Sequence, residues 1–369
     1  MLVRAGALLF AAFAVLAAVA VAQSQIFVDL ALATDRTKAL VPLGEILPGG
    51  PPPDGIPPID RPTFVAPAVA RAWLRPKEPV LAVGIAGDAR AYPLQILVWH
   101  EIVNDVIGGT PVVVTYCPLC NSGLVFERTV EGTRLDFGTS GRLYKSDLVM
   151  YDRQTHSLWA QMEGRAIVGA RAGTVLRRVP ANTLAFDDWQ DAHPRGKVLS
   201  RDTGFTRRYG VNPYQAYDQP ALAPFLFDEK PDPRRQPKER VVGIVIGQEA
   251  RAYPWPVLAD RRAVHDALAG EALVIFYRPG ALSALDETEM ARSRAIGATT
   301  VFRPVASDRR LTFEAAGDHF RDRETGTTWN ALGQAVKGPL VGHRLEPIPH
   351  VDAFWFAWAA FHPKTTIHE

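Results

Sequence analysis

Two stretches of the chain resemble each other closely enough to constrain the whole fold. Residues 80–93 and 241–254 both have the pattern of a strand, a tight turn and a second strand, and both contain Ala-Arg-Ala-Tyr-Pro. Three further pairs of segments match downstream: 112–118 with 273–279, 152–159 with 322–329, and 176–194 with 345–363. Self-similarity that keeps the same order along the chain indicates an internal duplication.

Each copy predicts the same order of elements. A hairpin leads into an amphipathic helix, expected over 94–106 in the first copy and 256–268 in the second, and a short apolar strand and further hairpins follow. Runs of strands with few helices are typical of α+β proteins. We therefore expect a strand-rich α+β fold of two tandem, diverged repeats that pack together.

The N-terminus has the form of an export signal. Arg4 precedes an uncharged, Ala-rich stretch that ends in Ala20-Val21-Ala22, a typical cleavage pattern. Residues 1–22 are thus predicted to be a signal peptide, or alternatively an N-terminal anchor. Both readings place the remaining domains outside the cytosol, either as a periplasmic or secreted protein or anchored to the membrane.

The remaining boundaries follow from composition and from the repeat. Residues 23–62 form a Pro-rich entry segment, and its second half, where the prolines lie, is expected to be extended or irregular. The predicted first repeat covers 63–200, a connection covers 201–240, and a second, cysteine-free repeat covers 241–369.

The charge of the chain limits its partners. The formal net charge is +2, and no basic run alternates with aromatic residues, so nucleic acid is not an expected partner. A redox partner or a small ligand is expected instead, and a membrane only if the N-terminal segment stays uncleaved.

The chain has two cysteines, Cys117 and Cys120, and both follow the β-branched run Val112–Thr115. In an exported protein a pair of cysteines usually forms a disulfide. A bridge across two residues closes a very small loop, however, and removes little entropy from the unfolded chain. A redox-active or metal-binding pair is therefore the favoured interpretation.

Comparison of the two copies separates shared scaffold from candidate chemistry. Cys117 and Cys120 align with Arg278 and Ala281, and the neighbouring pair His100-Glu101 aligns with Arg261-Arg262. His265 stands in the second copy where the first has Asn104. Residues found in one copy only are the candidates for a site, which places the reactive centre in the first repeat.

Two chemistries suit these residues, and they leave open whether the protein is an enzyme. In thiol redox, Cys117 would be the nucleophile and Cys120 the resolving thiol, or the reverse, with His100 or Glu101 handling protons. A helical turn opening at Cys120 would lower the pKa of a thiol there.

In metal binding, Cys117, Cys120 and His100 would be ligands. His265 or Met150 would be the fourth group. Thiolates with imidazole or thioether ligands favour copper(I), whereas the two cysteines alone are an incomplete zinc site. Copper is therefore the expected cofactor if there is one.

A rival hypothesis is a non-catalytic module that binds a ligand or a partner. Its disulfide would only pin a loop, and the aromatic residues Trp99, Tyr116 and Tyr144 would line a ligand groove.

Four segments resemble one known family: 99–105, 115–122 with its Tyr-Cys-Pro-Leu-Cys sequence, 141–152 and 354–358. They are similar to the prokaryotic family catalogued as domain of unknown function 3179. The resemblance runs from about Pro79 to near the C-terminus. It implies membership of that family and frequent export, but no particular reaction.

Overall fold

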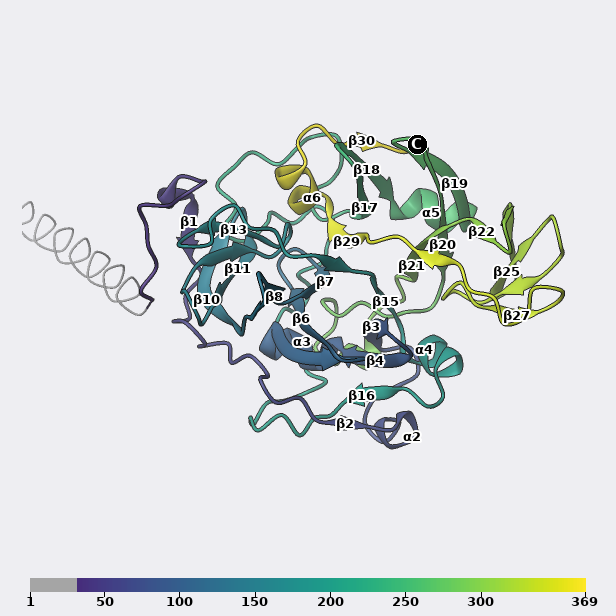
Figure 1. The fold of residues 1–369 in the computed structure, drawn as a ribbon, viewed down its shortest axis with the longest axis horizontal. Helices are drawn as coiled ribbons and strands as arrows, with labels where there is room; N and C mark the ends of the chain where they lie inside the picture. Colours follow the sequence, from purple (N-terminus) through teal and green to yellow (C-terminus); the bar gives the residue numbers. More distant parts are fainter. Residues whose placement is uncertain (1–31) are drawn as a thin grey trace, which may run out of the picture.

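The computed structural model describes residues 32–369 and shows a strand-rich α+β protein with several sheets (Figure 1). Helices account for 11% and strands for 41%, which confirms the α+β class expected from the sequence. The predicted signal segment, residues 1–22, lies outside the described residues. Within residues 32–369, no helix combines the length and the apolar character needed to cross a membrane.

The first half, residues 63–200, contributes to three sheets and a small hairpin. In spatial order they are β15(Ala181–Ala185)-β3(Pro79–Ile85)-β4(Asp88–Pro93)-β16(Lys197–Leu199)-β2(Phe64–Val65), β14(Arg178–Val179)-β7(Ser122–Glu127)-β6(Thr110–Cys117)-β5(Ile102–Ile107), β1(Ile46–Pro48)-β10(Phe137–Tyr144)-β11(Asp147–Asp152)-β12(Leu158–Ala160)-β13(Arg165–Val168), and β8(Thr129–Val130)-β9(Thr133–Arg134). The helices in this part of the chain are η1(Leu43–Glu45), α2(Pro67–Ala70), α3(Leu94–His100) and α4(Phe186–Ala192).

The second half, residues 241–369, contains three four-stranded sheets and a hairpin. They are β29(Val351–Phe354)-β17(Arg240–Ile246)-β18(Glu249–Pro254)-β30(Thr366–Ile367), β19(Ala263–Leu268)-β20(Glu271–Arg278)-β21(Ala298–Arg303)-β28(Glu346–Pro347), β24(Phe313–Ala316)-β25(His319–Asp322)-β26(Thr328–Trp329)-β27(Ala335–Lys337), and β22(Val305–Ala306)-β23(Arg309–Arg310). The helices are α5(Trp255–Arg261), η2(Met290–Arg292) and α6(Trp355–Phe361).

The helix expected over residues 94–106 is shorter than predicted. It ends at His100 because Glu101 adopts a left-handed backbone with φ of 57° and donates its N–H to Leu97, 2.7 Å away. The β-branched residues that follow then pair with β6 as strand β5. The helix expected over 256–268 is wrong in the same way, since α5 ends at Arg261 and Arg262 has φ of 61°.

Residues shared by the two halves make the same contacts in each. Asp105 accepts hydrogen bonds of 2.5 Å from both Arg90 and Tyr92. In the second half, Asp266 accepts from Arg251 and Tyr253 at 2.6 and 2.9 Å. The indole N–H of Trp159 donates to Asp152, and that of Trp329 donates to Asp322, both at 2.9 Å. These shared residues hold the sheets together.

The Pro-rich segment lies along the first half. Its strand β1 pairs with β10, and Ile59 exchanges backbone hydrogen bonds of 2.9 Å with Ile102 and Asn104 of β5. Its irregular, extended backbone therefore completes the edges of the first-half sheets.

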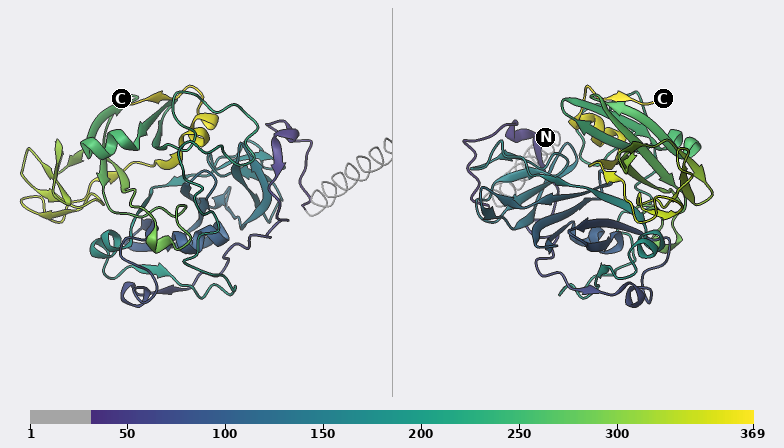
Figure 2. Two further views of the ribbon diagram at one scale, coloured as in Figure 1. Left: turned by 180° about the vertical axis from the view of Figure 1, so that it is seen from behind. Right: turned by 45° about the vertical axis from the view of Figure 1, so that its right-hand side comes forward.

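One hydrophobic cluster contains residues of both halves. The apolar run Phe354–Ala359, which includes most of α6, is buried in the same cluster as β6 and β7 of the first half. Strand β29 runs between the teal strands of the first half and the green strands of the second, as Figures 1 and 2 show. The amide of Phe354 donates a hydrogen bond of 2.9 Å to the carbonyl of Cys120. The second half therefore touches the cysteine turn directly.

Candidate functional site

The cysteine pair lies in the turn between two buried strands. Cys117 is the last residue of β6 and pairs with Ser122, the first residue of β7. The turn closes through a hydrogen bond of 3.2 Å from the Asn121 N–H to the Pro118 carbonyl, with Asn121 in the left-handed region at φ of 54°. Cys120 lies inside this turn and opens no helix, so no helix terminus acts on its thiol.

A buried glutamine fixes the base of the turn. The Gln161 amide nitrogen donates to the hydroxyl of Thr115 at 2.9 Å and to the carbonyl of Ser122 at 3.1 Å. Its amide oxygen accepts from the Ser122 hydroxyl at 2.9 Å. All three side chains are fully buried, so the strands that carry the cysteines are tied by satisfied polar contacts.

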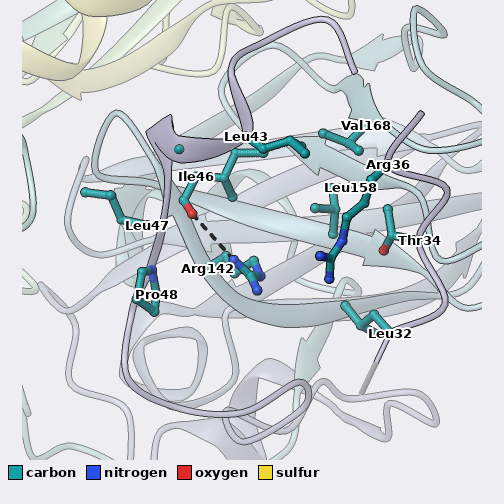
Figure 3. Close-up of a pocket in the computed structure, with 11 residues that line it drawn as sticks. Leu32, Thr34, Arg36, Leu43, Ile46, Leu47, Pro48, Arg142, Leu158 and Val168 are labelled. Carbon is teal, nitrogen blue, oxygen red and sulfur yellow. Dashed lines mark hydrogen bonds between the residues drawn. The ribbon is translucent and has the colours of Figure 1, made fainter. Parts of the chain in front are cut away.

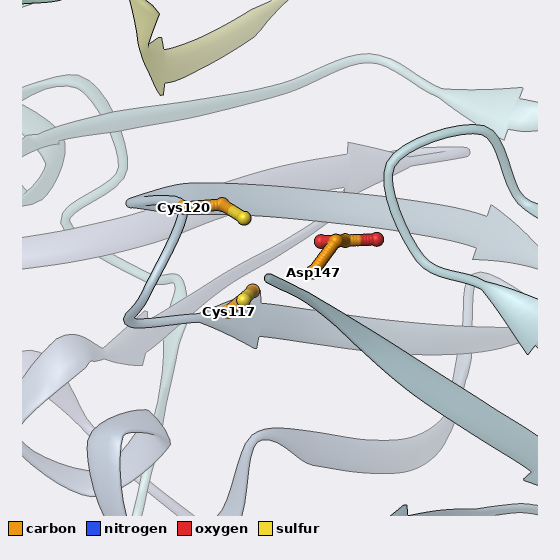
Figure 4. Close-up of side chains that lie close together, drawn as sticks. All are labelled: Cys117, Cys120 and Asp147. Carbon is orange, nitrogen blue, oxygen red and sulfur yellow. The ribbon is translucent and has the colours of Figure 1, made fainter. Parts of the chain in front are cut away.

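Asp147 completes a three-residue cluster with the cysteines (Figure 4). One ligand atom from each of Cys117, Cys120 and Asp147 lies within 4.8 Å of the others, and the two sulfurs are 3.7 Å apart. Asp147 is the first residue of β11. Its Oδ2 accepts the Met162 N–H at 2.8 Å, while its Oδ1 is buried with no hydrogen-bond partner among residues 32–369.

Burial controls the electrostatics of this cluster. It raises the pKa of Asp147 to about 7 and the pKa of each thiol above its ordinary value. In the described part of the chain, Asp147 forms no ion pair, and the groups that most affect the pKa of these three residues are amides, thiols and carboxyl groups. The cluster therefore concentrates negative charge whenever its groups ionise.

Glu101 is a fourth acidic group beside the cluster. Its left-handed backbone follows α3, and its side chain is nearly buried. Burial raises the pKa of Glu101 to about 8, and the negative charge of Asp147 adds to this rise. The hydroxyl of Tyr214 lies 3.5 Å from Oε1, which is a long hydrogen bond. Glu101 adjoins the cluster without belonging to it.

The histidines predicted as ligands lie elsewhere. Both ring nitrogens of His100 are hydrogen-bonded, Nδ1 to the Pro57 carbonyl at 2.7 Å and Nε2 to the Tyr209 hydroxyl at 2.6 Å. Burial lowers the pKa of His100 to about 4. His265 belongs to β19 of the second half, where its Nε2 accepts the Phe313 N–H at 2.8 Å. The cluster of possible ligands contains neither residue.

Met150 and the predicted disulfide also differ from the expectation. Met150 is fully buried in the hydrophobic core, which is the simplest role for a methionine on β11. Cys117 and Cys120 are free thiols, and 3.7 Å is far longer than the ~2.05 Å of a disulfide bond. The disulfide of the non-catalytic alternative is therefore not formed.

A cavity of about 390 Å³ lies beside the cluster. Leu119 of the cysteine turn, Leu148, which follows Asp147, and Glu101 form part of its wall. Tyr214, Tyr217 and Phe225 also line it, whereas the three aromatic residues expected in a groove, Trp99, Tyr116 and Tyr144, are not among its lining residues.

A second cavity, of about 180 Å³, lies against β1 and β10 (Figure 3). Arg36 and Arg142 point toward it, and Arg142 also donates to the Ile46 carbonyl at 3.5 Å. No cysteine, histidine or acid is among the described residues that line it. It therefore lacks the groups for either predicted chemistry.

Two features of this region were missed by sequence reasoning. Asp147 follows a turn in the first copy and was not singled out, although the cysteines lack a third ligand without it. The tyrosines of the cavity come from the connection, 201–240, for which the sequence predicted no part in a site. Both gaps arise from long-range packing, which no local pattern encodes.

Comparison with known proteins gives one match. Residues 53–365 match the family described as a protein of unknown function, DUF3179. No curated protein and no solved structure matches the chain. Because the match covers nearly the whole chain, this protein belongs to the DUF3179 family.

Proposed function

We propose that this protein binds a thiophilic metal ion through Cys117, Cys120 and Asp147, with zinc as the ion that the donor set suits best. The observation that carries the proposal is the convergence of two thiol sulfurs and a carboxylate in one buried cluster. A fourth coordination position remains for a water molecule or a substrate, as in catalytic zinc sites.

The distance between the sulfurs supports this proposal. Zn–S bonds of about 2.3 Å at the tetrahedral angle place two sulfurs about 3.8 Å apart. The observed separation of 3.7 Å between Cys117 and Cys120 is close to this value. A carboxylate oxygen on the same side, supplied by Asp147, suits a third tetrahedral position.

The negative charge of the cluster also supports metal binding. Buried thiolates and carboxylates are costly unless a cation or hydrogen bonds compensate them. Among the described residues Asp147 forms no ion pair, so a bound ion would supply the positive charge that this cluster lacks.

We also propose that the chain is a diverged duplication. The second half can then be compared with the first, position by position, at the site. The sheet order β15-β3-β4-β16 corresponds to β29-β17-β18-β30. The N–H of Tyr116 donates to the Glu101 carbonyl at 2.8 Å, and that of Tyr277 donates to the Arg262 carbonyl at 2.7 Å. These parallels support two tandem repeats, 63–200 and 241–369, joined by the connection.

In this duplication one site residue, Cys117, and the neighbouring Glu101 are replaced by cations. Arg262 stands in place of Glu101, and Arg278 ends β20 where Cys117 ends β6. The Arg278 guanidinium lies between Asp188 and Asp318, at 3.3 and 2.5 Å. A fixed guanidinium charge thus stands in the second half where we place a metal charge in the first.

Copper(I) is the second candidate ion. Two soft thiolates favour it, whereas a carboxylate as third ligand is a harder donor that suits zinc better. Neither predicted histidine supplies a softer third ligand in this arrangement, which is why we rank zinc first.

Thiol redox is the second candidate function. The free, adjacent thiols of a Cys-x-x-Cys turn favour it, because a small movement would bring them to bonding distance. The raised pKa of both thiols disfavours it, because the thiolate is the nucleophile.

We further propose export, with residues 1–22 as the signal segment and the folded part periplasmic or secreted. The sequence of that segment is the support. A small ligand or a redox partner remains the proposed partner.

The test is the metal content of protein purified under reducing conditions from a medium containing zinc and copper. Stoichiometric zinc is expected, with loss in Cys117→Ser and Asp147→Asn. Asp352→Asn, another buried acid whose pKa is raised, is the matched control and should retain the metal. Wild-type protein without metal and with a readily reduced disulfide would support thiol redox instead.

A further inference from the structure

The cavity beside the cysteine cluster is assembled from three separated parts of the chain. The Pro-rich segment contributes Pro51 and Ile56, the first half contributes Leu119, Leu143 and Leu148, and the connection contributes Tyr214, Tyr217 and Phe225. Its volume of about 390 Å³ falls within the range of about 300–1,000 Å³ typical of small-molecule sites. A helix or a folded partner would not fit into such a space, so the occupant is a small molecule.

The inner wall of this cavity adjoins all three proposed ligands. Leu119 lies between the two cysteines in sequence, and Leu148 directly follows Asp147. Tyr214 also lines the cavity, and its hydroxyl lies 3.5 Å from Oε1 of Glu101, which adjoins the cluster. A molecule in the cavity therefore lies against the residues that carry the cluster.

The lining defines the chemistry of the molecule. Aliphatic and aromatic side chains make up most of the wall, and its polar members are Glu101, Thr139, Arg142 and Gln215. The Arg142 guanidinium points toward the second cavity and donates to the Ile46 carbonyl, so the charged group on the side of the cluster is Glu101. Apolar walls favour an uncharged, mainly apolar ligand, and a carboxyl group can hydrogen-bond to a hydroxyl or carbonyl on it. An anionic ligand would bring its charge toward the acidic cluster, which is unfavourable.

We infer that this cavity is the substrate site of the proposed metal centre and that it takes a small, uncharged, mainly apolar molecule with a single hydroxyl or carbonyl group. The polar group meets Glu101, which adjoins the cluster, and the apolar part lies between Leu143, Phe225 and the two tyrosines. This assignment rests on the proposed metal-binding function.

The test uses 2-naphthol as the probe and naphthalene-2-sulfonate as its charged counterpart, with binding followed by probe fluorescence. Saturable binding of 2-naphthol is expected, and binding of the sulfonate roughly ten-fold weaker or worse. Phe225→Ala removes part of the wall and should weaken 2-naphthol binding about five-fold or more. Leu222→Ala is the matched control, because Leu222 is a similarly exposed apolar residue of the connection that is not among the cavity-lining residues.

A double comparison separates this inference from the proposed function. Cys117→Ser should lose the metal and keep 2-naphthol binding, whereas Phe225→Ala should keep the metal and bind 2-naphthol weakly. In the cobalt(II)-loaded protein, 2-naphthol should shift the visible absorption bands of the ion.

Three results would overturn the inference: no saturable 2-naphthol binding, equal effects of Phe225→Ala and Leu222→Ala, or an unchanged cobalt spectrum at saturation. Protein that binds 2-naphthol but no metal would overturn the metal function, and with it the assignment of the cavity to a metal centre.

Discussion

The amide of Phe354 in the second half donates a hydrogen bond of 2.9 Å to the carbonyl of Cys120 in the first. The ring of Phe354 is fully buried and packs near Tyr217 and Phe356. The turn that carries the proposed ligands is thus held from both halves of the molecule. A second half without cysteines still shapes the site in this way.

This contact predicts how a distant substitution affects the site. Phe354→Ala should destabilise the protein by about 3–5 kcal/mol, because it leaves a cavity in the core. It should also weaken metal binding, because the cysteine turn loses its packing. Denaturant unfolding and metal titration under folding conditions measure the two effects.

Phe320→Ala is the matched control. Phe320 is also fully buried, but it stacks on Phe276 in a separate core cluster of the second half. Phe320→Ala should lower the free energy of unfolding by a similar amount and leave metal affinity unchanged. Equal metal affinities in the two variants would contradict a supporting role for Phe354.

The buried glutamine below the turn gives a second prediction. Gln161→Leu leaves the buried Ser122 hydroxyl without its partner and removes one of the two hydrogen bonds of the Thr115 hydroxyl, which still donates to the Leu124 carbonyl. We expect a loss of about 1–3 kcal/mol of stability. The substitution should also weaken metal affinity, because the hydrogen bonds that Gln161 makes to the two strands carrying the cysteines are lost. Gln95→Leu, at a fully buried glutamine bound to Glu78 and Arg201, should cost stability alone. The same metal affinity in Gln161→Leu as in wild type would rule out this positioning role.

Arg278 gives a prediction for the second half. Arg278→Gln removes the charge between Asp188 and Asp318, and one oxygen of Asp188 already lacks a hydrogen-bond partner among the described residues. We expect a loss of about 1–3 kcal/mol at neutral pH with unchanged metal content. Calorimetry measures the stability, and elemental analysis measures the metal content. A change in metal content would contradict the proposal that the metal site belongs to the first half and that the second half is scaffold.

Asp352 predicts a pH dependence of stability. Burial raises its pKa to about 7, although the hydrogen bond from Thr299 and the charge of Arg240 oppose the rise. An aspartate in the unfolded chain has a pKa near 4, so the unfolded state releases its proton first. The stability associated with this group is therefore complete below about pH 4 and is lost as the pH rises to about 7.

Asp352→Asn removes this titration. Its free energy of unfolding relative to wild type should increase between pH 4 and 7, by at most about 4 kcal/mol. The comparison is made on metal-free protein, where all other groups titrate alike in both chains. A difference that stays constant over this range would show that Asp352 titrates normally in the folded protein.

The sequence predicted the elements that depend on local pattern. The hairpin over residues 80–93 and the buried strand before Cys117 follow from β-branched residues and turn chemistry, and both are present. The tight turn, predicted at Gly87-Asp88, lies one residue earlier at Ala86-Gly87, because Asp88 already pairs with Ile85. The helix over 94–106 was predicted too long, because its end depends on the left-handed Glu101 and on pairing with β6. Local periodicity contains neither constraint.

The candidate site was predicted in part for the same reason. Cys117 and Cys120 are separated by only two residues, so the spacing of the pair alone identified them as a candidate site. Asp147 reaches them only because the β10–β11 hairpin folds over the turn, a contact between residues 30 apart that sequence spacing does not reveal. His100 and His265 matched the chemistry of a ligand, but hydrogen bonds to Pro57, Tyr209 and Phe313 hold them elsewhere.

The most direct measurement of the central claim is X-ray absorption at the metal edge of the purified, metal-loaded protein. A zinc spectrum with two sulfur neighbours at about 2.3 Å and lighter oxygen neighbours is expected, and Asp147→Asn should alter the oxygen shell. A spectrum with no sulfur neighbours, or one identical in Asp147→Asn, would contradict a centre built from Cys117, Cys120 and Asp147.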